Sequence, residues 1–263
     1  MTASRNPMSL AGQVVVVTGA AQGIGLASAT LAYELGASLA LIDMNEAALA
    51  EVAGRFDAER VLIVAGNVAD PAFVDGAFEA AGARFGALHG LVNSAGIIRP
   101  AMIEKMQLAQ WQQVIDVNLS GSYFCVQAFG RLALARIKAG QEGDQVLRSI
   151  VNISSDAGRM GSIGQINYSA AKAGLFGITM STAREWSRHG VRSNAICFGL
   201  VETPMTETVR GDRFREGVLA RIPMGRWAQV DDAAQPICFF LSPASSYITG
   251  QVISVDGGGY MSS

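Results

Sequence analysis

Short apolar runs alternate along the chain with stretches whose apolar residues recur at the spacing of one helix face. Apolar runs that predict strands lie near 13–18, 38–43, 60–65, 88–93, 147–153, 191–197 and 252–256. Helical patterns lie between them, near 24–35, 45–56, 70–84, 107–138, 167–188 and 230–241. Strict alternation of strands and helices predicts the α/β class, with a doubly wound, seven-stranded parallel sheet flanked by helices on both faces.

Length and composition indicate one domain. The 263 residues are 50% hydrophobic and include 30 glycines, which suits one sizeable core with many tight strand-to-helix turns. No repeat, linker or low-complexity tract divides the chain, so we expect a single domain over 1–263. The long connection at 203–220 is expected to form a substrate lid, because long connections in compact domains are often functional.

The predicted lid combines apolar and basic residues. The apolar residues would suit an apolar or aromatic ketone, but the same pattern fits a helix with a solvated basic face, which we favour. The residues are Met205, Val209, Phe214, Val218 and Leu219, interleaved with Arg210, Arg213 and Arg215.

Charge and hydropathy argue against nucleic-acid and membrane partners. A net charge of −2 gives no electrostatic attraction for nucleic acid or for an anionic membrane. Residues 1–10 lack a long apolar core, and no uninterrupted apolar run approaches the ~20 residues of a membrane span. We therefore expect a cytoplasmic protein.

Cysteine and histidine content argues against metal and disulfide chemistry. Cys125, Cys197 and Cys238 are widely spaced and form no CxxC motif, so neither a disulfide framework nor a thiolate metal site is expected. His89 and His189 are the only histidines, which weakens the case for a zinc-dependent alcohol dehydrogenase or a Ser/His/Asp hydrolase. We assign no metal ligand.

A glycine-rich turn follows the first predicted strand. The stretch TGAAQGIG places Gly19, Gly23 and Gly25 immediately before a helical pattern. Glycines allow a dinucleotide pyrophosphate to approach the backbone, and the first amides of the helix favour its negative charge. The spacing only partly meets the general GxGxxG fingerprint, so a glycine-rich turn without a ligand remains the alternative.

Asp43 ends the second predicted strand, 18 residues beyond Gly25. A carboxylate here can accept hydrogen bonds from the adenosine ribose of NAD and would repel the extra phosphate of NADP. The neighbouring positions carry Gln22 and Met44 rather than the Arg or Lys that NADP sites usually recruit. NAD is therefore the expected cofactor, although Asp43 could also be a solvated strand end or the cap of a helix starting near Asn45.

Tyr168 and Lys172 stand four residues apart in the stretch NYSAAKAG. On a helix this spacing places both side chains on one face, where the ammonium group could lower the pKa of the phenol. An ordinary tyrosine loses its proton near pH ~10, so such a neighbour would prepare Tyr168 for proton exchange with an alcohol or a carbonyl. The pair is a candidate acid/base device.

Six motifs occur in order across nearly the whole chain: TGAAQGIG, NSAG at 93–96, Asn118, NISS at 152–155, YSAAK, and YITGQVISVDGG near the end. The sequence thereby resembles the short-chain dehydrogenase/reductase family in its compact form of one Rossmann domain, with a likeness to its 3-oxoacyl reductase members.

The resemblance implies roles for four residues. Tyr168 would be the general acid for carbonyl reduction and the general base for alcohol oxidation, and Lys172 would lower its pKa and hold the nicotinamide ribose. Ser155 would hydrogen-bond the substrate oxygen, and strand alternation would point the neighbouring Ser154 to the other side. Asn118 resembles the family asparagine that holds a water linking the lysine to solvent, but it could also close a local kink inside a helix.

The resemblance also implies a set of cofactor contacts. Asn67 and Val68 would flank the adenine, residues 93–96 would line the adenosine ribose side, and three residues at 199–203 would reach the nicotinamide. The whole expected set is Gly19, Gln22, Gly23, Ile24, Gly25, Asp43, Met44, Asn67, Val68, Asn93, Ala95, Gly96, Tyr168, Lys172, Gly199, Val201 and Thr203.

Three positions depart from the family pattern. Asn67 stands where Asp is usual and Ser94 where Asn is common, and both retain hydrogen-bonding capacity. Phe198 stands where a Pro-Gly pair normally begins, which removes a rigid φ constraint and adds a ring near the nicotinamide pocket.

The expected function is an NAD(H)-dependent oxidoreductase that interconverts a secondary alcohol and a ketone. A 3-oxoacyl thioester reductase is the alternative within the family, and a non-catalytic nucleotide sensor or scaffold is the alternative from another class. Related reductases often carry an arginine where this chain has His189, although Arg188 lies beside it. A neutral histidine attracts an acidic carrier protein poorly, so we favour a small free substrate.

We also expect a homotetramer, partly from the family resemblance. The helical patterns at 107–138 and 167–188 carry more large apolar residues than one helix face against a sheet requires, and packing across a twofold axis would bury the excess. The alternative is that all of these rings point into the sheet. They are Tyr123, Phe124, Phe129, Phe176 and Trp186.

Overall fold

The computed structural model describes residues 6–141, 146–207, 216–217 and 219–261. Its seven strands form one sheet in the order β3-β2-β1-β4-β5-β6-β7, and every neighbouring pair is parallel. The predicted fold class is confirmed, and each predicted strand is found within two residues of its expected limits. The strands are β1 Val14–Thr18, β2 Ser38–Asp43, β3 Val61–Ala65, β4 Gly90–Asn93, β5 Arg148–Ser155, β6 Val191–Phe198 and β7 Val252–Val255.

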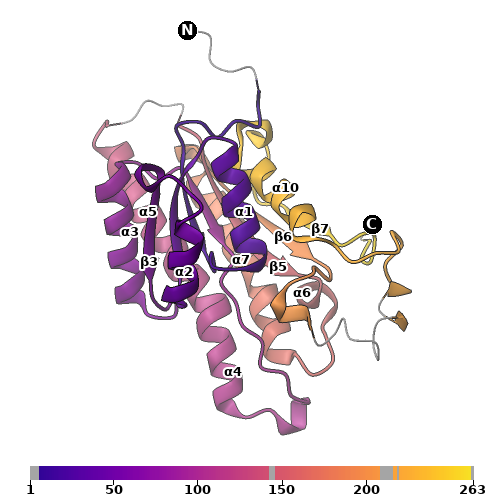
Figure 1. Ribbon diagram of the computed structural model, residues 1–263. Coiled ribbons are helices and arrows are strands. Elements are labelled where there is room, and N and C mark those ends of the chain that lie inside the picture. Colours follow the sequence, from indigo (N-terminus) through magenta and orange to yellow (C-terminus); the bar gives the residue numbers. More distant parts are fainter. Residues whose placement is uncertain (1–5, 142–145, 208–215, 218, 262–263) are drawn as a thin grey trace.

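Helices cover both faces of this sheet (Figure 1). They are α1 Gly23–Glu34, α2 Glu46–Ala53, α3 Pro71–Phe85, α4 Leu108–Ile115, α5 Gly121–Lys138, α6 Ala157–Met160, α7 Ile166–Trp186 and α10 Val230–Leu241. The order of the strands reverses between β1 and β4, because the chain winds outward from β1 in one direction and from β4 in the other. Ligands of such sheets bind beside the carboxyl ends of the strands at this switch point.

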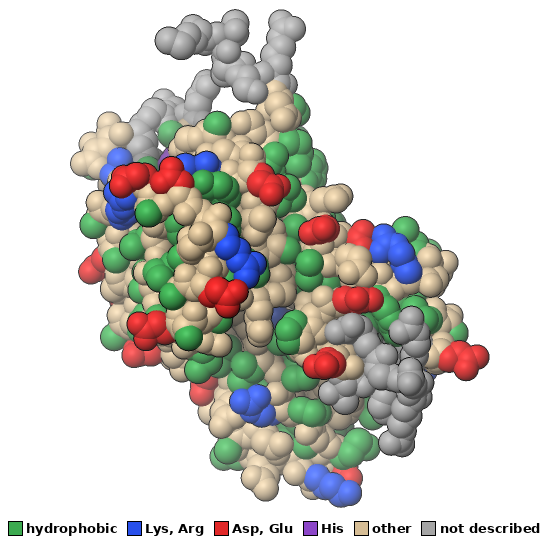
Figure 2. All heavy atoms as spheres, in the orientation of Figure 1, with side chains coloured by type: hydrophobic (Ala, Val, Ile, Leu, Met, Phe, Trp, Pro, Cys, Tyr) green, Lys and Arg blue, Asp and Glu red, His purple; other side chains and the backbone are tan. Residues whose placement is uncertain are grey.

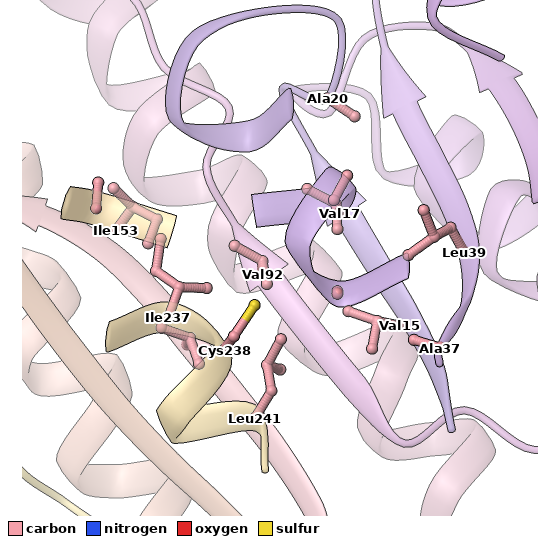
Figure 3. Close-up of a cluster of buried hydrophobic side chains, with 14 of the residues drawn as sticks. Val15, Val17, Ala20, Ala37, Leu39, Val92, Ile153, Ile237, Cys238 and Leu241 are labelled. Atoms are coloured by element: carbon pink, nitrogen blue, oxygen red, sulfur yellow. The ribbon is translucent and has the colours of Figure 1, made fainter. Parts of the chain in front are cut away.

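Strand β1 shows how alternation in the sequence divides the core into two layers. Val15 and Val17 pack in a cluster with residues of α1, α2 and α10, part of which is drawn in Figure 3. Val14 and Val16 point the other way, into a cluster with residues of α3 and α5. Both faces are apolar because a parallel sheet is covered on both sides.

The helix predicted over 107–138 is interrupted. The structure contains α4, then a π-helical turn at Asp116–Ser120, and then α5. A π turn adds one residue to the helical repeat and often marks a functional site. The hydrophobic periodicity does not show it because the apolar pattern continues through the turn, which also holds the buried Asn118. The short helix α6 was not expected from the sequence.

The predicted lid lies only partly within the described residues. Thr203 precedes a short 3₁₀ helix at Pro204–Thr206, whereas 208–215 and 218 lie outside the described residues. Most of the lid residues named above are therefore outside them as well: Val209, Arg210, Arg213, Phe214, Arg215 and Val218.

Within the described ranges, no helix is long and apolar enough to cross a membrane, and no group of His, Cys, Asp and Glu could hold a metal ion. The three cysteines are free and buried. Figure 2 shows acidic and basic side chains interspersed over one face of the molecule.

Candidate active site

A cavity of about 340 Å³ opens at the carboxyl ends of the central strands. Segments that follow six of the strands, β1 to β6, contribute to its wall, although these segments are distant in sequence. Fifteen of the expected cofactor contacts line it: Gly19, Gln22, Gly23, Ile24, Asp43, Met44, Asn67, Val68, Ala95, Gly96, Tyr168, Lys172, Gly199, Val201 and Thr203. Gly25 and Asn93 are absent from this wall.

The glycine-rich turn brings the backbone close to the cavity. Gly19 has φ +66°, and a Cβ atom added there would lie 2.8 Å from the backbone nitrogen of Ala95. Gly23 has φ +56° and begins α1, whose first amides donate no hydrogen bond to the side chain of the N-cap residue Gln22. Two glycines in the left-handed region and a helix start without a side-chain cap together fit an anionic pyrophosphate.

Gly25 and Asn93 support the site from behind. A Cβ atom on Gly25 would lie 2.1 Å from the carbonyl oxygen of Gly19, so glycine is needed for α1 to pack against the turn. Asn93 is 2% exposed and donates a hydrogen bond from Nδ2 to Oδ1 of Asn152 at 2.9 Å, which links β4 to β5. In the structure both residues make packing contacts, and the expectation that they contact the cofactor stays a prediction.

Asp43 is held at the edge of the cavity by two backbone amides. Its Oδ2 accepts a hydrogen bond from the amide of Ala21 at 3.0 Å, and its Oδ1 accepts one from the amide of Asn45 at 3.0 Å. The N-cap of α2 is Asn45, whose side chain accepts from Ala48, so Asp43 is not the helix cap. Lys172 is the only Lys or Arg among the described residues of the wall.

Tyr168 and Ser155 meet on one side of the cavity. Tyr168 lies in the first turn of α7, and Ser155 is the last residue of β5. Burial raises the pKa of Tyr168 to about 12, and a hydrogen bond with the Ser155 hydroxyl opposes this rise. The phenol is therefore neutral near pH 7 and can act as a proton donor.

Lys172 lies one helical turn after Tyr168, as the spacing predicts. Its Nζ lies 5.6 Å from the centre of the Tyr168 ring and donates a hydrogen bond to the carbonyl of Ile153 at 2.7 Å. Burial lowers the pKa of Lys172 to about 8. The expected lowering of the pKa of Tyr168 by this lysine is not found, because burial raises that pKa and only the hydrogen bond with Ser155 opposes the rise.

Ser154 and Asn118 make contacts that hold the site together. The Ser154 hydroxyl donates to the backbone carbonyl of Lys172 at 2.8 Å and so ties β5 to α7. The fully buried Asn118 accepts from the amide of Ile97 at 2.8 Å and donates to its carbonyl at 3.0 Å. Asn118 lies behind Gly96, where an added Cβ would be 3.5 Å from Asn118 Oδ1 and 3.7 Å from Lys172 Nζ. The π turn corresponds to the local kink considered for Asn118.

Sequence and structure comparisons identify the family. A family model described as enoyl-(acyl carrier protein) reductase matches residues 19–260. A 3-oxoacyl-[acyl-carrier-protein] reductase of Synechocystis is 39% identical over 257 residues, which cover 95% of this chain and 98% of that protein. A solved short-chain dehydrogenase/reductase, described as a glucose/ribitol dehydrogenase from Brucella melitensis, is 30% identical with a TM-score of 0.87, covering 96% and 98% of the two chains.

The chain belongs to the short-chain dehydrogenase/reductase family. It is thus an oxidoreductase with a binding site for a nicotinamide cofactor. A second solved member is similar along the same length. This gluconate 5-dehydrogenase from Burkholderia cenocepacia, in complex with NADP and tartrate, is 32% identical with a TM-score of 0.88, covering 96% and 97% of the two chains.

Several wall residues of this short-chain dehydrogenase/reductase were not among the expected cofactor contacts, although three of them lie in the predicted lid. One lies four residues beyond the end of β4, one lies inside the π turn, and three lie six to eight residues beyond the end of β6. Strand ends could have indicated the first of these, whereas the π turn gives no signal in the periodicity. The residues are Ile97, Val117, Pro204, Met205 and Thr206.

Proposed function

We propose that this enzyme interconverts a 3-oxoacyl thioester and the corresponding 3-hydroxyacyl thioester with a nicotinamide cofactor. The observation that carries the proposal is the meeting of Ser155, Tyr168 and Lys172 at one wall of a cavity whose other end is the glycine-rich turn. The similarity to a 3-oxoacyl-[acyl-carrier-protein] reductase over 98% of that protein favours a thioester over the small free ketone that we favoured from the sequence.

The nicotinamide would supply or accept the hydride, and the protein would supply position and a proton. In the reducing direction, the Ser155 hydroxyl donates a hydrogen bond to the substrate carbonyl, and Tyr168 transfers its proton to the same oxygen. A pKa of about 12 keeps Tyr168 protonated until the oxygen gains negative charge. Lys172 would hold the nicotinamide ribose with the ammonium group that now contacts Ile153.

We propose NAD(H) as the preferred cofactor. The glycine cradle at Gly19 and Gly23 fits a pyrophosphate, and the Asp43 carboxylate would accept hydrogen bonds from both adenosine ribose hydroxyls. Met44 is 71% exposed at the cavity rim and offers no charge to a 2′-phosphate. NADP is bound in the similar gluconate 5-dehydrogenase, so cofactor choice is the point at which this chain is expected to differ from it.

We further propose that 203–220 covers the substrate. The described start of this segment supports the proposal, because Thr203, Pro204, Met205 and Thr206 border the cavity. A side chain on Gly23 would approach Cγ2 of Thr203 to 3.3 Å, so the segment reaches across to the phosphate end.

A free secondary alcohol or ketone is the second candidate substrate, since the similar gluconate 5-dehydrogenase is named for a small hydroxy acid. The histidine that supported this reading from the sequence does not decide between the two. His189 follows the carboxyl end of the 21-residue helix α7, whereas Tyr168 lies in its first turn. At 1.5 Å per residue the two ends are about 30 Å apart, so His189 lies far from the cavity of its own subunit.

The function is tested with one substrate panel under identical conditions. Acetoacetyl-CoA, a 3-oxoacyl carrier protein and free ketones are compared by kcat/KM with NADH and NADPH. The proposal expects a thioester to exceed every free ketone by more than about tenfold, equivalent to ~1.4 kcal/mol. A free ketone ahead by that margin would replace the thioester with the second candidate. NADH binding without any turnover would favour a nucleotide sensor.

We propose a homotetramer as the assembly. Of the five large rings on which the expectation rested, Phe129 is fully buried and Phe124 and Trp186 pack against the core, so these three do not form an exposed excess. The exposed large apolar residues on these helices are Leu108 on α4, Tyr123 on α5, and Ile166 and Met180 on α7. Association through these helices would remove them from water.

A further inference from the structure

Two carboxyl groups meet directly behind the Ser155 side of the cavity. Asp156 follows Ser155 at the end of β5, and Asp256 follows the last residue of β7. Strand β6 separates these two strands in the sheet. The two carboxyl groups nevertheless approach each other across the end of β6, where both border Gly199, and Asp256 affects the ionisation of Asp156 as a charged and hydrogen-bonding neighbour would. A hydrogen bond between two carboxyl groups requires that one of them carries a proton.

The hydrogen-bond partners indicate which group holds the proton. Asp256 accepts from the amide of Gly258 at 2.9 Å through Oδ1 and from the amide of Tyr260 at 2.6 Å through Oδ2, so each of its oxygens already accepts a backbone hydrogen bond. Asp156 Oδ1 is buried and has no hydrogen-bond partner among the described residues. Burial and the neighbouring Asp256 raise the pKa of Asp156 to about 7, while Arg159 opposes this rise.

The other ionisable groups around Asp156 do not neutralise it. Arg159, on α6, donates to the carbonyl of Val252 and lies over the rings of Phe176 and Tyr260, at 5.7 Å and 5.2 Å from their centres. Cys197, on β6, has its pKa raised by burial and also faces Asp156 and Arg159. Lys172, on α7, interacts with Cys197 and is held by Ile153.

The carboxyl pair encloses a part of the cavity wall. A Cβ atom added to Gly199 would lie 2.9 Å from Cβ of Asp256 and 3.2 Å from Oδ2 of Asp156. The amide of Asp156 donates to the carbonyl of Phe198 at 3.1 Å. Phe198, Gly199 and Ser155 all line the cavity, whereas neither aspartate does. The pair thus holds three strand ends together immediately behind the wall.

We propose that Asp156 and Asp256 share one proton and act as a positioning pair, which holds Ser155 and the Phe198–Gly199 wall in place for hydride transfer. The positioning role rests on the function proposed above, whereas the sharing of a proton does not. When the shared proton is lost, two carboxylates face each other across Gly199, and their repulsion separates the ends of β5 and β7.

The kinetic test compares Asp156→Asn with the wild-type enzyme over pH. The amide keeps a hydrogen-bond donor toward Asp256 but cannot titrate. The ratio of kcat/KM, variant over wild type, is expected to rise at least about threefold between pH ~6 and ~8.5, where the wild type loses the shared proton. Asp156→Leu, which cannot donate, should be impaired at every pH. Glu79→Gln, at an exposed carboxylate of α3, is the matched control and should give a flat ratio.

A second measurement does not depend on turnover. The infrared band of a protonated carboxylic acid should be present in the ligand-free wild type near pH ~6, disappear toward pH ~8.5 and be absent from Asp156→Asn. Because the folded pKa of Asp156 is raised from 3.8 to about 7, protonation stabilises the fold below pH ~4, and this stabilisation is lost as the pH rises through ~7. As the pH rises from ~6 to ~8.5, the melting temperature of the wild type should therefore fall by at least about 3 °C relative to that of Asp156→Asn.

The outcomes separate the two proposals. A missing carboxylic acid band, or parallel melting curves, would overturn the shared proton. A band that behaves as expected with a flat kinetic ratio would overturn the positioning role. If no substrate of the panel is turned over, the proposed function fails, and the infrared and melting measurements still decide whether the pair exists.

Discussion

The preference for NADH over NADPH is the most direct test of the site, because it depends on the charge of Asp43. A 2′-phosphate about 5 Å from this carboxylate would be repelled by about 1–3 kcal/mol per unit charge at effective dielectric constants of ~80 to ~20. The two amide hydrogen bonds from Ala21 and Asn45 fix the carboxylate, so it cannot turn away from the phosphate. Wild-type kcat/KM should therefore favour NADH over NADPH by at least about tenfold, or ~1.4 kcal/mol.

Three variants test the origin of this preference. Asp43→Ala should bring the NADH to NADPH ratio toward one, because the repulsion is removed. Adding Met44→Arg to that variant should favour NADPH, since position 44 is exposed at the cavity rim and arginine can bind a phosphate in two contacts. Glu46→Gln is the matched control, because it removes an exposed acidic charge from the first turn of α2 and should leave the ratio unchanged.

The assay is steady-state kinetics with both cofactors at one pH and ionic strength, beside a melting curve for each variant. The melting curves are needed because Asp43→Ala leaves the part-buried amide of Ala21 without its acceptor, which costs about 1–3 kcal/mol, whereas the exposed amide of Asn45 can bond to water. Equal efficiency of the wild type with NADH and NADPH would refute the reasoning. A change of the ratio in Glu46→Gln as large as in Asp43→Ala would show that general charge, not Asp43, sets the preference.

Three further predictions concern catalysis, packing and assembly. Tyr168→Phe should bind NADH but turn over at least ~100-fold more slowly, because only the proton donor is lost, and near-normal activity would assign proton transfer to another group. Ser155→Ala should also be slow, whereas Ser154→Ala should mainly lower the melting temperature, since it loses a bond to the carbonyl of Lys172. Gly25→Ala should lower the melting temperature strongly, because its Cβ would lie 2.1 Å from the carbonyl oxygen of Gly19. An added Cβ on Gly76 would have nothing within 4 Å, so Gly76→Ala should stabilise α3 by about 0.5–1 kcal/mol in urea unfolding. Light scattering at micromolar protein should give a tetramer mass, and a monomer mass would refute the proposed assembly.

The hydrophobic pattern predicted most of the fold because strands and helices have different periods. Alternating apolar runs and helical patterns give the limits of β1 to β7 closely, and their order implies a parallel sheet. The interruption at Asp116–Ser120 could not be predicted in this way, since a π turn changes the backbone hydrogen bonds without changing which residues are apolar.

The glycine-rich turn and the Tyr-Lys pair could also be predicted, because each consists of residues close together in the chain. Gly19 and Gly23 form a left-handed turn whose need for glycine follows from backbone sterics, and the spacing of Tyr168 and Lys172 follows from the helical repeat. The sequence could not separate wall residues from supporting ones. Gly25 belongs to the same motif as Gly19, but only the packing of α1 on the turn shows that it faces a carbonyl rather than the cavity.

The sequence by itself therefore determined the elements, the glycine turn and the candidate catalytic side chains, because each depends on residues close together in the chain. Tertiary structure alone decided their protonation and their partners. Burial, which depends on the whole fold, raises the pKa of Tyr168 and lowers that of Lys172. The pairing of Asp156 with Asp256 joins strands that are not neighbours in the sheet. Such contacts arise only when distant segments pack together and exclude water.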